Sequence, residues 1–194
     1  MAARRLTDFE QVLLGLIAAA PSAGYDLKHQ FAMTPLGVYQ PSSGALYPAL
    51  RRLEHAGLLR AERGEPDGNG RARRRFVYHI TEPGRAAHVA WVRQPVDPQT
   101  VGTDLPLHLM RFVMMEGLLP REEVLGFLAD LRDALAAFLD KLETYAAELG
   151  PTLGGHHPGL ALDHGISAHV ASLAWTKRTI IVLAGQGCDQ RAQP

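Results

Sequence analysis

The sequence predicts a mainly α-helical fold with one small β-hairpin, in which an N-terminal winged helix-turn-helix precedes a C-terminal α-helical domain. Three helical patterns and then a hairpin pattern fill about the first 80 residues, which is the element order of a winged helix-turn-helix. Residues 1–93 hold 13 Lys and Arg against 8 Asp and Glu, whereas residues 94–194 hold 7 against 12. This asymmetry, hidden in a net charge of zero, indicates a basic binding module joined to a second module. A heptad pattern in the second half indicates a helical bundle.

The first two helices are marked by their caps and their apolar spacing. Thr7 and Glu10 have the spacing of a capping box. The apolar residues that follow lie on one helical face: Phe9, Leu13, Leu16, Ile17 and Ala20. Residues 20–24 break this helix, and Ser22 can cap a second helix that ends before Pro35.

The third helix is expected over residues 42–55 and would be the recognition helix. Ser42 and Ser43 can each cap it, and Gly57 supplies its stop. Its buried face follows spacings of 4 and 3 residues: Leu46, Leu50 and Leu53. Pro48 removes a backbone donor, so we expect an irregular first turn over residues 42–47.

A basic hairpin follows the third helix. Residues 58–63 and 73–80 have strand patterns, and the glycine-rich and proline-containing segment 65–70 between them predicts a turn. Four arginines stand near the tip, where a phosphate backbone could reach them: Arg71, Arg73, Arg74 and Arg75. An isolated basic cluster can also be a solvated surface, but the order helix, stop and hairpin favours nucleic acid.

From Thr81 onward, the sequence predicts helices that are separated by segments containing proline and glycine. A helix begins at Thr81 and runs to about Arg93, and the proline-containing segment after it predicts a linker. We therefore expect a winged helix-turn-helix domain over 1–93, a linker over 94–104 and a helical dimerisation and effector domain over 105–194. Helices are expected over 105–116, 120–149 and 160–183, with a loop over 150–159.

The helix expected over 120–149 carries an unbroken heptad seam. Its members are Val124, Leu128, Leu131, Leu135, Phe138, Leu142, Tyr145 and Leu149. Apolar residues on either side widen the seam, which indicates a bundle helix with more than one neighbour. We expect self-association through Leu128, Leu131, Leu135, Phe138 and Leu142, and the alternative is a helix pair within one chain.

Several motifs of the first half resemble the PadR family of bacterial transcriptional regulators. They are Leu-Leu-Gly-Leu at 13–16, Gly-Tyr-Asp-Leu at 24–27, Ser-Gly-Ala-Leu-Tyr-Pro-Ala-Leu-Arg-Arg-Leu-Glu at 43–54 and Tyr-His-Ile-Thr-Glu-Pro-Gly-Arg at 78–85. The second half resembles the longer, Vir-like form of the family, loosely at residues 162–166 and at Trp175. The resemblance implies a homodimeric regulator, a repressor or an activator, whose winged domains bind a palindromic operator. It also implies that the C-terminal helices dimerise, and it leaves room for a small effector.

The candidate site residues follow from this reading. An arginine such as Arg51 can distinguish guanine in the major groove, and Ser42, Ser43 and Tyr47 would touch phosphates. The full DNA-binding set is Tyr25, Lys28, Ser42, Ser43, Tyr47, Arg51, Arg52, Arg71, Arg73, Arg74 and Arg75. The alternative is a winged-helix module that binds protein without an operator, which would not need this many arginines.

Two tryptophans leave two interpretations open. Trp91 and Trp175 are either core or interface filler, or the walls of a pocket for an aromatic or amphipathic effector.

Other chemistry is poorly supported by the sequence. With Cys188 as the single cysteine, neither a disulfide nor a structural zinc rhythm is expected, and no catalytic motif is evident. We expect no metal site, no cofactor and no enzymatic activity. No signal peptide or membrane span is recognisable, so we expect a cytoplasmic protein.

Overall fold

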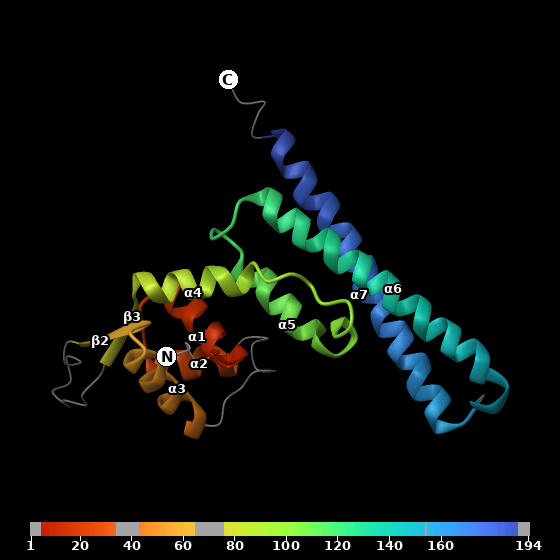
Figure 1. Ribbon diagram of the computed structural model, residues 1–194, viewed down its shortest axis with the longest axis horizontal. Coiled ribbons are helices and arrows are strands. Elements are labelled where there is room, and N and C mark those ends of the chain that lie inside the picture. The colour runs from red at the N-terminus through yellow and green to blue at the C-terminus, as the bar shows by residue number, and fades with distance from the viewer. Residues whose placement is uncertain (1–4, 34–42, 65–75, 154, 190–194) are drawn as a thin grey trace. The chain divides into compact units, whose positions relative to one another are not determined.

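The structure is a computed structural model that describes residues 5–33, 43–64, 76–153 and 155–189 of the 194. The chain divides into two compact units, Met1–Gln94 and Pro95–Pro194. The first unit holds four helices and three short strands among its described residues, and the described part of the second holds three helices (Figure 1). The predicted mainly helical fold with a small sheet is confirmed.

The first unit is a winged helix. Its elements are α1 (Asp8–Ala19), β1 (Ser22–Ala23), α2 (Gly24–Met33), α3 (Ser43–His55), β2 (Leu59–Arg63), β3 (Phe76–Ile80) and α4 (Glu82–Val92). The capping box at Thr7 is present: Thr7 Oγ1 accepts from Glu10 N at 3.3 Å, and Glu10 Oε2 accepts from Thr7 N at 3.0 Å. Thr81 caps α4 by accepting from Gly84 N at 3.2 Å.

The sheet has one strand more than the hairpin that the sequence predicts. Its order is β1-β3-β2, with both pairs antiparallel, and Ser22 lies opposite Tyr78. Ser22 therefore does not cap α2. Its hydroxyl donates to Ala20 O at 2.9 Å, and Asp26 Oδ2 accepts from Ala23 N at 3.4 Å instead. The link between α1 and α2 is thus part of the base of the wing.

The helix α3 is regular through Pro48, so the expectation of an irregular turn is wrong for the residues that the structure describes. Pro48 lacks the N–H that would bond to Gly44 O, a loss of one hydrogen bond near the helix start. Packing compensates for it. Four side chains of α3 are 0–1% exposed and anchor the helix in the core: Leu46, Ala49, Leu50 and Leu53.

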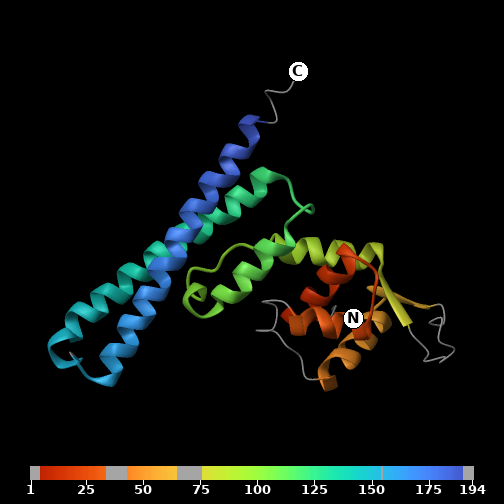
Figure 2. The ribbon, with the colours of Figure 1, turned by 180° about the vertical axis from the view of Figure 1, so that it is seen from behind.

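The second unit consists of α5 (Val101–Met114), α6 (Arg121–Leu153) and α7 (His157–Asp189). The start of α5 lies four residues before the expected Leu105, so the last residues of the expected linker are helical. The helix α6 also continues through residues 150–153, which we expected to be a loop. Pro151 has no backbone N–H, so the helix loses one hydrogen bond near its end. Figure 2 shows α6 and α7 side by side and antiparallel.

The heptad seam of α6 is the core of this unit. Leu128, Leu131 and Leu135 are 0% exposed within a single chain, because α5 and α7 pack on this side of the helix. Phe138 and Leu142 keep partial exposure. The three leucines are therefore core residues that a second copy of the folded unit cannot reach, which corrects their assignment as dimer contacts.

Candidate nucleic-acid interface

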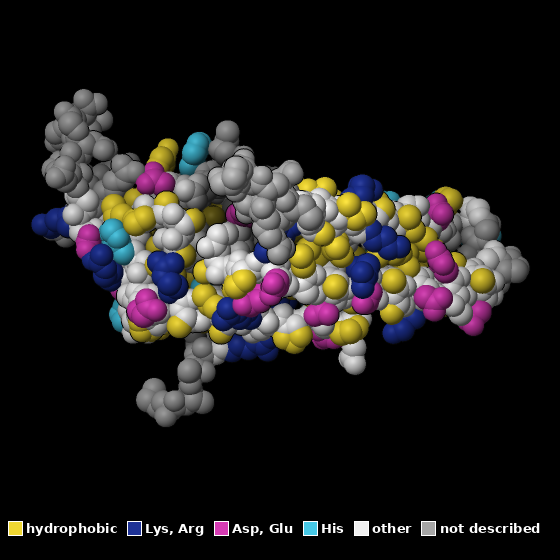
Figure 3. All heavy atoms as spheres, turned by 90° about the horizontal axis from the view of Figure 1, so that it is seen from above, with side chains coloured by type: hydrophobic (Ala, Val, Ile, Leu, Met, Phe, Trp, Pro, Cys, Tyr) yellow, Lys and Arg dark blue, Asp and Glu magenta, His cyan; other side chains and the backbone are white. Residues whose placement is uncertain are grey.

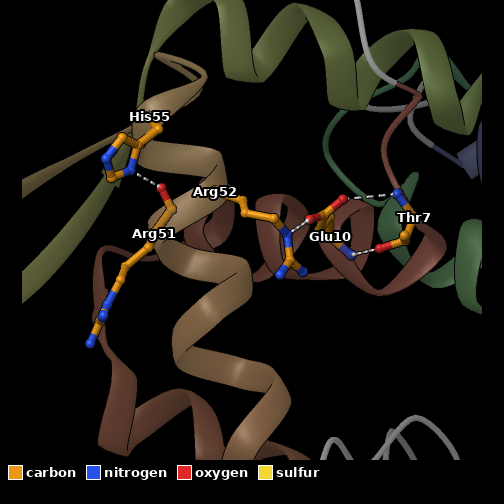
Figure 4. A network of polar contacts seen from close by, with 5 residues as sticks. All are labelled: Thr7, Glu10, Arg51, Arg52 and His55. Atoms are coloured by element: carbon orange, nitrogen blue, oxygen red, sulfur yellow. Dashed lines mark hydrogen bonds and ion pairs between the residues drawn. The ribbon is translucent and has the colours of Figure 1, made fainter.

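The helix α3 exposes one polar stripe opposite its buried leucines. Tyr47 is 44% exposed, and Arg51 and His55 continue the same stripe one and two turns further on. His55 Nδ1 lies 2.7 Å from Arg51 O. In Figure 4 the Arg51 side chain extends away from the neighbouring polar network. A guanidinium and a phenol at this spacing can face one stretch of a DNA groove.

The ring of Tyr47 packs against α2 at Gly24. A Cβ atom at Gly24 would lie 2.7 Å from Tyr47 Cε1, so the ring occupies the space that Gly24 leaves open. The next residue, Tyr25, is 71% exposed, and Lys28 is exposed one turn later. The start of α2 and the first half of α3 thus bring three predicted DNA-binding residues, Tyr25, Lys28 and Tyr47, to neighbouring elements of one unit.

Tyr78 of β3 lies within electrostatic reach of α3 and was not among the predicted site residues. Its side chain is buried in β3, and burial raises the pKa of its hydroxyl. Glu54 raises that pKa further and Arg51 partly opposes the shift, so both charged groups lie within electrostatic reach of the phenol. Tyr78 therefore stays protonated at neutral pH. The strand pattern over residues 73–80 includes Tyr78, but no sequence signal could place this residue beside α3.

The two adjacent arginines of α3 differ in their surroundings. Arg52 Nε donates to Glu10 Oε1 of α1 at 2.8 Å, in an ion pair whose carboxylate is 0% exposed (Figure 4). Arg51 makes no such contact with α1. The sequence grouped Arg51 and Arg52 as DNA contacts, and the structure gives them different neighbours.

Part of the predicted interface lies outside the described residues. These positions are Ser42, Arg71, Arg73, Arg74 and Arg75, and for Ser43 the structure describes only the backbone, at the first residue of α3. In the described strands of the wing, Glu62 pairs with Arg60 on β2 and lies 3.1 Å from His79 Nε2 on β3.

The two tryptophans each pack inside their own unit. Trp91 is 4% exposed and stacks on His88, with ring centroids 5.7 Å apart. Trp175 on α7 meets Phe112 of α5 edge to face at 5.6 Å. These contacts fit the interpretation of both tryptophans as packing residues, and a role as effector walls stays a prediction.

A buried polar cluster in the second unit was also missed from the sequence. Arg111 is 3% exposed and lies 5.1 Å from the centroid of the Phe127 ring, and its Nη1 is 3.5 Å from Nδ1 of the buried His108. Burial and the neighbouring Arg111 lower the pKa of His108, which favours the neutral form of its imidazole. Among the described residues, no group of three or more His, Cys, Asp or Glu side chains could hold a metal ion.

A three-stranded sheet packed with α2 and α3, and an exposed polar stripe on α3, define the winged helix-turn-helix class. Residues 13–89 match the Transcriptional regulator PadR-like family, so the chain carries a PadR-like domain and the resemblance seen in its motifs is confirmed over this range. The family match does not reach the second unit. None of the helices in the described part of the chain has the length and hydropathy needed to cross a membrane.

Individual relatives are similar over different extents. Transcriptional regulator Rv3488 of Mycobacterium tuberculosis is 55% identical over 49 residues, which are 25% of this chain and 42% of that protein. The match thus spans less than half the length of this curated relative. Bacillus subtilis PadR, solved in complex with operator DNA, is 19% identical at a TM-score of 0.45, over 93% of this chain and 99% of that chain. The PadR-like regulator BC1756 from Bacillus cereus is 23% identical at a TM-score of 0.41, over 94% and 99%.

Proposed function

We propose that this protein is a sequence-specific DNA-binding transcriptional regulator that acts as a repressor from the cytoplasm. The observation that carries the proposal is the exposed stripe of α3 on a PadR-like domain. Tyr47 and Arg51 stand on the outside of a helix whose other side is fully buried, beside the exposed Tyr25 and Lys28 of α2. In a helix-turn-helix this is the surface that enters the major groove.

The charge of the first unit supports the same conclusion. Residues 1–94 carry 13 Lys and Arg against 8 Asp and Glu. The wing arginines, Arg71, Arg73, Arg74 and Arg75, would add phosphate contacts that raise affinity without reading sequence. Arg51 would supply the base readout, since a guanidinium can bond to two acceptors of guanine at once.

We further propose that the protein binds a palindromic operator as a homodimer through exposed apolar residues of the second unit. Val170, Ile181 and Val182 on α7 are 48–71% exposed, although the same helix also packs on α6. Val170 and Ile181 are 11 residues apart, about three turns, and so lie on the same side of α7. Figure 3 shows hydrophobic side chains along the exposed surface of the helical unit. A helix that is apolar on two sides needs a second neighbour.

A mobility-shift assay tests the proposed function directly. The full chain is mixed at low salt with DNA from upstream of its own gene and with fragments of the same genome. We expect retardation of a duplex that holds an inverted repeat, with half-sites about one helical turn apart. No retardation of any fragment would overturn the proposal.

An effector is the remaining part of the proposal. A small aromatic or amphipathic compound would release the DNA only if it binds one state of the regulator better than the other. Trp91 and Trp175 are the predicted reporters. A compound that quenches tryptophan fluorescence and weakens DNA binding over the same concentration range would identify it.

A further inference from the structure

The carboxylate of Glu10 links two helices of the winged unit (Figure 4). It belongs to α1 and is 0% exposed. Its Oε2 accepts from Thr7 N at 3.0 Å, and its Oε1 accepts from Arg52 Nε of α3 at 2.8 Å. A buried carboxylate is tolerated only when it is paired and hydrogen-bonded, and the guanidinium of Arg52 supplies part of that pairing for Glu10.

Arg52 is tied to this contact although much of it faces solvent. Its side chain is 47% exposed, yet its Nε is held by Glu10. Arg51, the preceding residue, leaves the helix in another direction and extends away from Glu10. Because Arg52 sits one residue beyond Arg51, a fixed Arg52 also fixes the rotation of α3 about its axis.

We propose that Arg52 is a positioning residue rather than a DNA contact. Through Glu10 it sets the rotation of α3 on α1 and thereby the direction in which Tyr47 and Arg51 point. The inference rests on the proposed function. It replaces the phosphate role that the sequence suggested for Arg52.

The variant Glu10→Gln separates the two roles of Arg52. An amide has one acceptor oxygen, so it can accept from Thr7 N or from Arg52 Nε but presents its NH₂ group to the other donor. The ion pair is lost without leaving a buried charge. Arg52→Ala alone would take the arginine away from a buried carboxylate and endanger folding, so Arg52 is removed in the Glu10→Gln background. Arg51→Ala is the matched control on the same helix.

The full chain first selects a duplex from a random pool, and each variant is then titrated against that duplex and a scrambled one at several salt concentrations. We expect Glu10→Gln to weaken binding to the selected duplex about tenfold, with little change for the scrambled duplex, as expected when base readout is misaligned. The salt slope should stay unchanged, and Glu10→Gln/Arg52→Ala should bind no worse than Glu10→Gln. Arg51→Ala should also lose discrimination, but without a change in thermal unfolding.

A phosphate role for Arg52 gives the opposite results. Glu10→Gln would free the guanidinium and leave DNA affinity equal or higher, and adding Arg52→Ala would lower the salt slope by about one. A purely structural role would lower the unfolding temperature while leaving both affinities unchanged below it. Either result would overturn the inference and leave the proposed function standing. If the unaltered chain selected no duplex at all, the proposed function itself would fail.

Discussion

At the scale of the residue, Gly24 shows how one missing side chain prepares a surface. The ring of Tyr47 occupies the space where a Cβ at Gly24 would stand, at 2.7 Å from Cε1. That distance is far below van der Waals contact, so a larger residue at this position must displace the ring. The exposed stripe of α3 therefore depends on a residue of α2.

Gly24→Ala should lower affinity for a selected duplex by roughly tenfold, a loss of about 1–2 kcal/mol from one displaced contact. Fluorescence anisotropy with labelled DNA measures this loss. Gly126→Ala on α6 is the matched control, because a Cβ there meets nothing within 4 Å. The control should keep its DNA affinity and gain about 0.5–1 kcal/mol in stability. Equal affinity for both variants would contradict the proposed seating of Tyr47.

His88 predicts how the stability of the winged unit depends on pH. Burial lowers the pKa of its imidazole from 6.5 to about 4, while a hydrogen bond to the backbone of Gln11 acts in the other direction. The unfolded chain therefore binds more protons than the folded one between these two values, and stability falls as the pH falls from 6.5 to about 4. His88→Leu should flatten this part of the curve, as followed by thermal unfolding. A parallel curve for His88→Leu would refute the assignment.

At the scale of the element, helices were predictable where local signals agree with packing. The capping box at Thr7 and the leucine spacing of α3 fixed the positions of α1 and α3, because both depend on neighbours in sequence. The prediction of an irregular turn at Pro48 was wrong because the free energy lost with one hydrogen bond is smaller than the free energy gained by burying four side chains of α3. The two-residue strand β1 has no pattern of its own, since its pairing with β3 joins residues more than 50 positions apart. For the same reason, the different surroundings of Arg51 and Arg52 could not be read from the sequence.

The core role of the α6 seam predicts large stability effects within one chain. Leu131→Ala removes a fully buried side chain and should destabilise the second unit by about 2–5 kcal/mol. Val113→Ala, at a position 60% exposed on α5, should change stability by less than about 0.5 kcal/mol. Chemical denaturation of the two variants measures both values. A small loss for Leu131→Ala would mean that this part of the seam is less tightly packed than its burial indicates.

At the scale of the whole molecule, the two units of the proposed regulator carry net charges of opposite sign and would have different functions. The basic unit would bind DNA, and the acidic helical unit would join two copies. Heptad spacing could show that α6 has an apolar face, but it could not show whether α7 of the same chain or a second chain covers it. In the structure, α7 of the same chain covers the apolar face of α6. The exposed apolar residues of α7 are therefore the candidate interface.

Ile181→Glu should therefore produce folded monomers, because it places a charge where the second copy is expected while the core of the unit stays intact. Sedimentation measures the mass, and circular dichroism checks that the helices remain. The proposed dimer also predicts weaker operator binding by this variant, since the two half-sites would be bound independently. Ala137→Glu, an exposed change on α6, serves as the charge control. An unperturbed dimer of Ile181→Glu would exclude this face.

The pairing of β1 with β3 also decides where the chain can be lengthened. Ser22 and Ala23 serve at once as the link from α1 to α2 and as an edge strand in register with Tyr78 and Val77. An insertion there would shift a ladder and a helix start together, because a slip of one residue turns each side chain to the opposite face. An insertion between β2 and β3 does not interrupt the strand β1 or the start of α2. Reporter peptides or purification tags placed inside this domain should therefore be accepted after Arg63 and before Phe76, and rejected between Pro21 and Gly24.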